Sequence, residues 1–175
     1  MGRHHAIASA VAMLALWAPS LVREAAAQQQ ERVSFTASSD NTKFTQQQNI
    51  EVGDVPKHIV RVFEVHRTYP DNPPLIAGEK LVEEWDRGVG NLINGNGSSK
   101  IYSIYVMENG DRFFARSAVV VQSASGKLKS TNVGTITGGT GRLGGMKGFV
   151  RASADYDLRS GDSNNQTDIE YSVGN

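Results

Sequence analysis

Beyond Lys57 the chain consists of short runs rich in branched and aromatic residues, a composition typical of β-strands. The clearest run is "HIVRVFEVHR" (58–67), and the pair Asn109-Gly110 marks a tight hairpin turn between two later runs. No window after residue 28 has an apolar stripe at helical spacing, so no helix is expected between the strands. We predict strands at 32–37, 58–67, 79–85, 100–107, 112–122, 127–137, 147–158 and 167–173.

Eight short strands joined by turns that contain glycine, serine or asparagine predict an all-β fold, an antiparallel barrel or a sandwich. We adopt the eight-stranded antiparallel barrel and assign it to residues 55–175. A closed barrel of about eight strands has an interior just wide enough for side chains or for one small ligand. A function is therefore to be sought in the interior.

The first 54 residues differ from the barrel region. Residues 1–27 combine a basic start, an apolar run and small residues at the A-x-A positions, which is the layout of a secretory signal peptide; a buried N-terminal helix is the alternative. The signal peptide predicts a secreted or periplasmic protein that begins near Gln28 and has no membrane span. Residues 28–54 are polar and glutamine-rich, so we expect a partly disordered leader that contains only the first strand.

The segment "GTITGGTGRLGGMKG" (134–148) contains G-x-G-x-x-G at Gly139, Gly141 and Gly144. A dinucleotide site would need a helix directly after these glycines. The following residues instead contain further glycines and then alternate as a strand does. We therefore interpret the glycines as structural, permitting sharp bends and close backbone approach between two barrel strands.

Composition excludes several classes of function. Lysine plus arginine and aspartate plus glutamate both number 18, so net charge gives no attraction to nucleic acid. Cysteine is absent, which excludes disulfides, a thiol nucleophile and cysteine metal sites. Only His58 and His66 follow the signal peptide, so no metal site is expected, and no cofactor is expected either.

The strand at 58–67 carries the first candidate site. Alternation places Val60, Val62, Glu64 and His66 on one face and both arginines, Arg61 and Arg67, on the other. Because arginines are easier to place outside, we expect Glu64 and His66 to point inward above the two valines. A carboxylate and an imidazole in an apolar cavity could perform acid–base work. The alternative is that Glu64 and His66 lie in solvent at the end of the strand and have no functional role.

"TITGGTGRLGGMKGFVR" resembles the glycine-rich stretches of allene oxide cyclases and dirigent proteins, and the resemblance covers roughly residues 57–173. These families share an eight-stranded antiparallel barrel and usually form trimers. The resemblance therefore implies the same barrel here, and a homotrimer.

The resemblance to allene oxide cyclases extends to the first candidate site. "Phe63-Glu64-Val65-His66" is similar to the family's Y-E-I-N, and Asn72-Pro73 to its Ser-Pro. The match implies that Glu64 stabilises charge on the substrate and that Pro73 is the loop proline. His66 stands where the family has a water-holding asparagine and Asn72 where it has serine, and the family's cysteine has no counterpart.

The strand at 100–107 offers a second lining for a cavity. Tyr102, Ile104 and Val106 share one face, and Ser103, Tyr105 and Met107 the other, and either face could point inward. We take Val60, Val62, Asn72, Pro73 and Tyr105 as candidate substrate-binding residues, and Glu64 and His66 as candidate catalytic residues.

Three functions fit these observations. The first is a barrel that binds a small apolar molecule and steers its cyclisation, as a cofactor-independent isomerase or a dirigent-type protein. The second is a non-catalytic carrier of the lipocalin kind, or a structural envelope barrel. The third is a fully packed barrel whose outer face mediates assembly.

Overall fold

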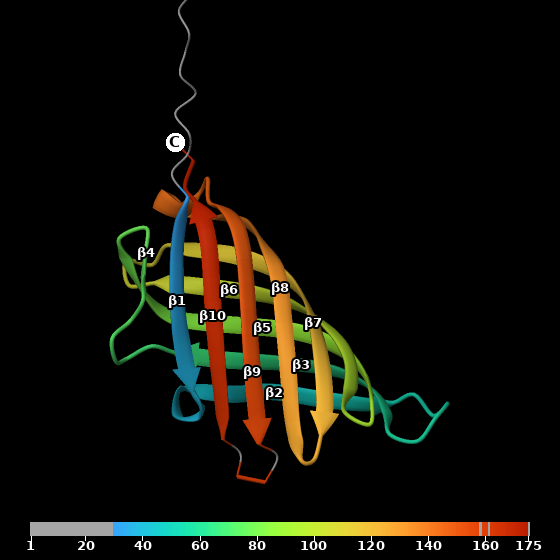
Figure 1. Ribbon diagram of the computed structural model, residues 1–175. Helices are drawn as coiled ribbons and strands as arrows, with labels where there is room; N and C mark the ends of the chain where they lie inside the picture. Colours follow the sequence, from blue (N-terminus) through green and yellow to red (C-terminus); the bar gives the residue numbers. More distant parts are fainter. Residues whose placement is uncertain (1–29, 158, 161, 175) are drawn as a thin grey trace, which may run out of the picture.

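A computed structural model describes residues 30–157, 159, 160 and 162–174 of the 175-residue chain. The predicted signal peptide lies outside these residues. The described residues form ten strands and two short 3₁₀ turns, and all strand pairings are antiparallel (Figure 1). The strands are β1 (Glu31–Ser38), β2 (Thr42–Glu51), β3 (His58–Thr68), β4 (Leu75–Ile76), β5 (Glu79–Ile93), β6 (Asn96–Met107), β7 (Arg112–Ala124), β8 (Lys127–Gly139), β9 (Lys147–Asp157) and β10 (Ser163–Ser172).

The strands make one continuous, strongly bent sheet in the order β1-β10-β9-β8-β7-β6-β5-β3-β2, with β4 paired to β5 alone. In Figure 1, β1, β10, β9 and β8 run lengthwise in front, and β2, β3, β5 and β6 cross behind them at a steep angle. The all-β antiparallel barrel expected from the sequence is thus confirmed at the level of architecture.

Full closure of the barrel is where the expectation was wrong. β1 and β2 are the two ends of the sheet order, and no pairing joins them among the described residues. The chain passes from one to the other through the 3₁₀ turn Ser39–Asn41. The sheet is therefore barrel-like in shape but retains two edge strands.

Strand β2 lies within 28–54, where we expected a leader with a single strand. Nine of its ten residues are exposed, because it is an edge strand whose two faces are both open to solvent. Its backbone pairs with β3 over most of its length, with a bulge between Phe44 and Gln46. A strand exposed on both faces needs no apolar alternation, which explains why the glutamine-rich sequence gave no strand signal.

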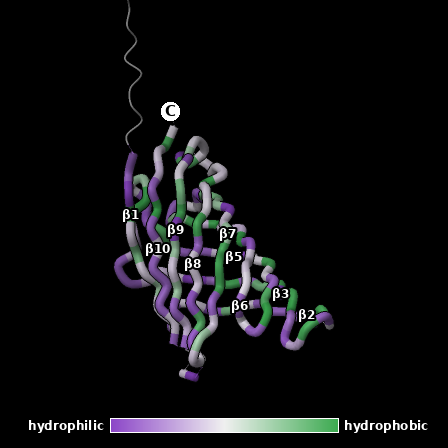
Figure 2. Tube along the Cα trace, turned by 45° about the vertical axis from the view of Figure 1, so that its right-hand side comes forward, coloured by the Kyte–Doolittle hydropathy of each residue, from purple (hydrophilic) through white to green (hydrophobic). Residues whose placement is uncertain are grey.

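The packed core occupies the end of the barrel where the glycine segment lies. It contains large side chains from both layers, with β4 and the turn after β8 adding further ones, while hydrophobic and hydrophilic positions alternate along the strands (Figure 2). Its largest fully buried members are Ile76, Leu81, Tyr105, Met107, Phe113, Leu143, Met146 and Ile169.

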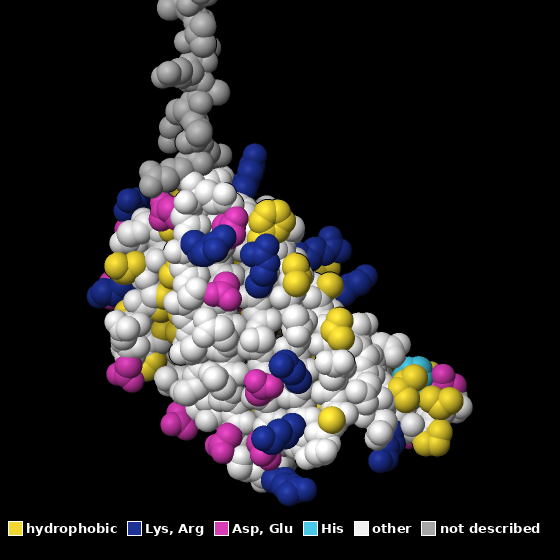
Figure 3. Space-filling model, viewed as in Figure 1, with side chains coloured by type: hydrophobic (Ala, Val, Ile, Leu, Met, Phe, Trp, Pro, Cys, Tyr) yellow, Lys and Arg dark blue, Asp and Glu magenta, His cyan; other side chains and the backbone are white. Residues whose placement is uncertain are grey.

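The outer surface carries apolar side chains as well. Val62, Val89, Val120 and Val133 are each about half exposed on the outside of the sheet. The connection from β2 to β3 projects from the body of the molecule, and Figure 3 shows hydrophobic side chains gathered on this projection beside a histidine. No helical segment among the residues that the structure describes has the length and apolar character to cross a membrane.

The glycine segment connects β8 to β9, as expected, and its only helical element is the 3₁₀ turn Gly141–Leu143. Leu143 and Met146 are buried and close this end of the core. At Gly141 the φ angle is +52°, and the Asp111 carboxylate occupies the space of a side chain. The glycines of this segment therefore permit a tight plug at the barrel end.

Gly148 provides a test of this role. Its φ angle is +150°, and a Cβ placed there would stand 2.0 Å from the carbonyl oxygen of Glu170 on β10. We expect Gly148→Ala to lower the free energy of unfolding by at least about 2 kcal/mol, because disfavoured backbone conformations cost about 1–3 kcal/mol and the clash adds to this. The measurement is urea denaturation followed by circular dichroism.

Gly144 is the matched control in the same segment. Its φ angle is −55°, and a Cβ placed there would have the Gly141 carbonyl oxygen as its nearest neighbour, at 3.3 Å. Gly144→Ala should change the free energy of unfolding by less than about 1 kcal/mol. Equal midpoints for the two variants would contradict the structural role of Gly148.

Candidate functional site

A buried ionic cluster lies on the inner face of β3 and β5. Arg67 Nη1 donates hydrogen bonds to Asp86 Oδ2 at 2.6 Å and to Glu84 Oε1 at 3.1 Å. Antiparallel pairing places Arg67 opposite Glu84, and Val65 opposite Asp86, so that all four side chains share one face. The side chains of Arg67, Glu84 and Asp86 are 12%, 4% and 8% exposed, so the interaction is made out of contact with bulk water.

Hydroxyl groups from neighbouring elements complete the cluster. The Tyr69 hydroxyl donates to Glu84 Oε2 at 2.5 Å, and Ser103 Oγ on β6 donates to Asp86 Oδ1. Tyr105 pairs with Glu84 across β5 and β6, and its ring stacks on Phe113 at 4.3 Å between centroids. The carboxylates thus lie between a cation, two hydroxyl donors and the aromatic wall of the core.

The cluster has two carboxyl groups for one guanidinium group. Burial raises the pKa of Glu84 to about 7, the Arg67 charge opposes this shift, and the nearby Asp86 charge adds to it. Burial alone would lower the pKa of Arg67, but Glu84 and Asp86 raise it, so Arg67 remains charged. Burial also raises the pKa of Tyr69, which therefore keeps its proton. Glu84 is the group that can exchange a proton near neutral pH.

Arg67 retains an unused donor. Its Nε is buried and has no hydrogen-bond partner among the described residues. A ligand oxygen that reached the cluster could accept from this N–H. Among the same residues, no group of three or more histidine, aspartate or glutamate side chains is arranged to hold a metal ion.

Glu64 and His66 share a face of β3, but it is the outer face, opposite to the expected direction. Glu64 accepts hydrogen bonds from Thr45 Oγ1 and from Arg87 Nε, both at 2.7 Å. The His66 ring stacks on Trp85 at 3.9 Å, with 13° between the planes. The hydrogen bond from Thr45, together with the charge of Arg87, lowers the pKa of Glu64 despite its partial burial.

The orientation of β3 was predicted wrongly because both arginines were assumed to avoid the interior. Arg67 is buried, and Glu84 and Asp86 compensate its charge there. Arg61 also lies on the inner face, where it is half-buried and its Nε donates to Asn49 Oδ1 at 2.9 Å. The partners of both arginines come from other strands, so the strand at 58–67 by itself could not indicate them.

The other candidate residues are divided between the two sides of the sheet. Val60 and Val62 lie on the outer face with Glu64. Asn72 is exposed in the loop after β3, where its φ angle is +52°. Tyr105 is buried and lies beside the ionic cluster, opposite Glu84. It is the one candidate binding residue that the structure places at this cluster.

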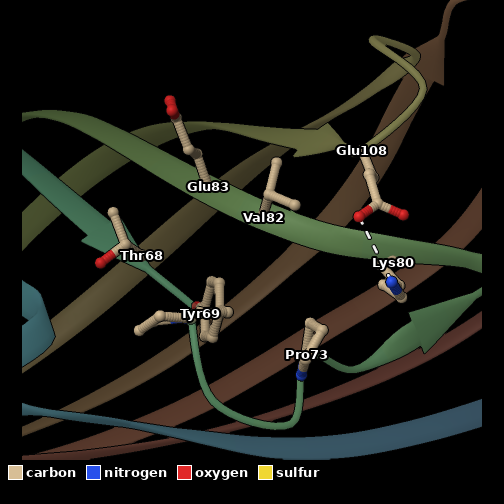
Figure 4. A pocket seen from close by; sticks show the side chains of 8 residues that line it. Thr68, Tyr69, Pro73, Lys80, Val82, Glu83 and Glu108 are labelled. Atoms are coloured by element: carbon tan, nitrogen blue, oxygen red, sulfur yellow. Dashed lines mark hydrogen bonds and ion pairs between the residues drawn. The ribbon is translucent and has the colours of Figure 1, made fainter.

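Pro73 lines a shallow open pocket of about 390 Å³ between the loop after β3 and strand β5 (Figure 4). Lys80 and Glu108 form an ion pair at 3.3 Å across one side of this pocket. Tyr69 forms part of its wall, while the Tyr69 hydroxyl reaches Glu84. Tyr69 therefore separates this outer pocket from the buried cluster.

Sequence reasoning missed Arg67, Glu84 and Asp86 as site residues. One signal was present: in "EEWDR" (83–87), Glu84 at the end of the strand predicted at 79–85 and Asp86 just beyond it would share a face if the strand continued. Acidic residues at alternate positions usually lie on a solvated face. Glu84 and Asp86 are recognised as buried only when the pairing of β3 with β5 places them beside Arg67.

Comparison with known proteins shows the fold of the chain. No protein-family model matches it, and no curated protein matches it by sequence. The solved structure of the pterocarpan synthase dirigent protein PsPTS1 matches with a TM-score of 0.51 and 15% identity, covering 85% of this chain and 97% of that one. The pterocarpan synthase dirigent protein GePTS1 matches with a TM-score of 0.48 and 13% identity, covering 92% of this chain and 98% of that one. The chain therefore has a dirigent-like fold, to which the allene oxide cyclase barrel is related.

The raised pKa of Glu84 predicts a pH dependence of stability. The ordinary pKa of a glutamate is 4.5, and in the folded protein that of Glu84 is about 7. Between these values the folded state holds the proton that the unfolded state has lost, so the free energy of unfolding falls as pH rises. This contribution is complete below pH 4.5 and is lost above about pH 7.

Glu84→Gln removes this titration and keeps the size of the side chain. We expect the difference in free energy of unfolding, wild type minus Glu84→Gln, to decrease from pH 4.5 to 7 and to be flat above, as measured by urea denaturation at each pH. Glu64→Gln is the control, because the pKa of Glu64 is lowered and its contribution changes at lower pH. Parallel curves for wild type and Glu84→Gln would show that Glu84 titrates normally.

Proposed function

We propose that this chain binds a small, mostly apolar molecule in the barrel interior and that Glu84 steers its cyclisation or isomerisation by proton transfer. The observation that carries the proposal is a buried carboxyl group with a pKa of about 7, held by Arg67 and Tyr69 inside a barrel. Buried groups with pKa values matched to proton transfer near neutral pH are characteristic of catalytic sites.

Solvent exposure of the inner face supports entry of a ligand. At the end of the barrel away from the packed core, inner-face residues such as Arg61, Phe63, Asn132 and Ala154 are half-buried rather than buried. Many inner positions there have small side chains, and three of them are glycine: Gly88, Gly90 and Gly134. The Phe63 ring lies over Gly88, and the hydroxyl groups of Ser99 and Ser117 lie over Gly90 and Gly134.

The chemistry follows from the charges of the cluster. Protonated Glu84 can donate a proton to a substrate oxygen as the bond from that oxygen to carbon breaks, and the Asp86 carboxylate can stabilise the positive charge that develops on the carbon. When the rearranged product forms, it returns a proton to the Glu84 carboxylate, so that isomerisation leaves the cluster unchanged. The Arg67 Nε–H can bind the substrate oxygen before the proton is transferred. The surrounding wall, which includes Tyr105 and Phe113, would restrict the conformations of the bound molecule. This mechanism requires no cofactor.

The dirigent-like fold supports the proposal only in general terms, since one fold hosts many functions. The similar solved structure belongs to a protein named as a pterocarpan synthase, which is consistent with ligand chemistry in a barrel of this shape. The trimer and the secreted or periplasmic location stay predictions. The exposed outer valines, among them Val62 and Val120, are the kind of surface that such a trimer would cover.

Interior binding can be tested with the neutral fluorescent probe N-phenyl-1-naphthylamine. Wild type should bind it saturably. Ala154→Trp, which adds a large side chain to the inner face of β9, should weaken binding at least about ten-fold, because the ring takes up space between the layers. Ser153→Trp places the same ring on the outer face one residue away and should leave affinity unchanged.

Circular dichroism and the unfolding midpoint verify that both variants fold, and the milder Ala152→Leu serves if Ala154→Trp does not. Unchanged affinity in a folded inner-face variant would refute an interior binding site.

Catalysis is tested on the small molecules that copurify with the protein, identified by mass spectrometry. We expect Glu84→Gln to bind such a molecule within about three-fold of wild type, while turnover falls about 100-fold or more, as for loss of a general acid. Wild-type turnover should decline as pH rises above about 7, where Glu84 loses its proton.

Glu64→Gln is the matched control on the outer face and should keep full turnover. If Glu64→Gln abolished turnover and Glu84→Gln did not, the role expected for Glu64 from the sequence would replace this proposal. Binding with no turnover in wild type would instead identify a carrier of the lipocalin kind.

A further inference from the structure

Besides Arg67 Nε, two further polar atoms on the inner wall have no hydrogen-bond partner among the described residues. Ser117 Oγ on β7 and Asn132 Oδ1 on β8 are buried, and neither makes a hydrogen bond to any described residue. Ser117 as a whole is only 4% exposed. Most buried polar groups in proteins are hydrogen-bonded, so two unpaired atoms on one wall require an explanation.

The two residues are neighbours on the inner face. Ser117 pairs with Gly134 and Val119 pairs with Asn132, so Ser117 and Asn132 are diagonal neighbours across β7 and β8. A Cβ at residue 134 would stand 2.0 Å from Ser117 Oγ, so the glycine at this position is what makes room for the hydroxyl. A diagonal relation corresponds to roughly 7–8 Å between Cα atoms, which one ligand group can bridge.

We propose that Ser117 and Asn132 form a polar subsite that binds one hydroxyl group of the ligand. The Asn132 Oδ1 atom can only accept, so the ligand group must donate a hydrogen bond; the Ser117 hydroxyl can either donate to or accept from the same group. The partner is therefore a small apolar molecule with a hydroxyl group, rather than a hydrocarbon or an ether.

The position of the subsite sets the size of this molecule. Ser103, which donates to Asp86, pairs with Ala115, and Ser117 is the next inner-face residue along β7. Ser103 and Ser117 are thus diagonal neighbours as well, roughly 7–8 Å apart. A molecule of about two fused rings can place its hydroxyl on Ser117 and Asn132 while its other end lies beside the ionic cluster. The subsite rests on the proposed function, since it binds the molecule on which Glu84 acts.

A matched pair of probes tests the subsite. 2-Naphthalenemethanol and 2-ethylnaphthalene have nearly the same shape, and a methyl group in the second takes the place of the hydroxyl group in the first. Binding is measured by the intrinsic fluorescence anisotropy of the naphthalene ring. Wild type should bind the alcohol roughly two- to ten-fold more tightly than the hydrocarbon, the range of one net hydrogen bond. In Ser117→Ala and in Asn132→Leu this ratio should fall to about one, with affinity for the hydrocarbon unchanged.

Stability gives a second readout that a purely structural serine would not satisfy. Ser117→Ala removes a buried hydroxyl that has no partner among the described residues, so its unfolding midpoint should equal or exceed that of wild type. Thr131→Ala is the control, because Thr131 is exposed on the outer face of β8 beside Asn132. It should retain the full preference for the alcohol.

The outcomes separate the subsite from the proposed function. If wild type binds both probes equally, or if the preference survives in Ser117→Ala and Asn132→Leu, the subsite is refuted while interior binding stands. If Ser117→Ala lowers the unfolding midpoint and keeps the preference, the serine is structural. If neither probe binds, the proposed function fails, and the subsite fails with it.

Discussion

The pairing of Arg67 with Glu84 and Asp86 determines which side of the sheet becomes the inside. Side chains alternate along a strand, so a shift of β3 by one residue against β5 would turn every residue to the other face. In that register Arg67 would lie outside, and Glu84 and Asp86 would be left inside without a cation. Leaving buried charges without their partner typically costs about 3–5 kcal/mol. The ion pairs can exclude the shifted register without adding net stability to the native one, because burying Glu84 and Asp86 without Arg67 is costly by itself.

The contacts of Glu64 and His66 on the outer face depend on the same pairing of β3 with β5. When Arg67 and Val65 point inward, Glu64 and His66 must point outward, where Arg87 and Trp85 are their direct partners across β5. In the Glu64–Arg87 ion pair the arginine side chain is 51% exposed and the glutamate side chain 14% exposed. The strand register thus places Glu64 and Glu84 on opposite faces of the sheet, and their pKa values shift in opposite directions. Glu64 lies near solvent and has a lowered pKa, whereas Glu84 is buried and has a raised one.

The sequence was sufficient for the architecture because architecture depends on local signals. Strand runs, the Asn109-Gly110 turn and the bends of the glycine segment are each encoded within a few residues, and all of them are found in the structure. Strand β2 escaped prediction because it pairs along one edge and buries neither face. The site escaped because it depends on contacts between strands: Arg67 looks like a surface residue until Glu84 and Asp86 are placed opposite to it. Glu64 and His66 share a face of β3, as alternation requires, but a single strand does not indicate which of its faces turns inward.

The interior of the barrel is packed differently at its two ends. At one end the turn after β8 inserts Leu143 and Met146, and large side chains fill the space between the layers. At the other end glycine and serine pair across the strands, as Gly90 does with Ser99 and Gly134 with Ser117, while Leu92, Ile101 and Val119 are buried there as well. β1 and β2 are not paired with each other among the described residues, so the sheet keeps two open edges. The ionic cluster lies between the two ends, next to Tyr105 and Phe113 on one side and one step from Ser117 on the other. A carboxyl group at this place is buried deeply enough for a raised pKa, and the proposed ligand would have to reach it from the end beyond Ser117.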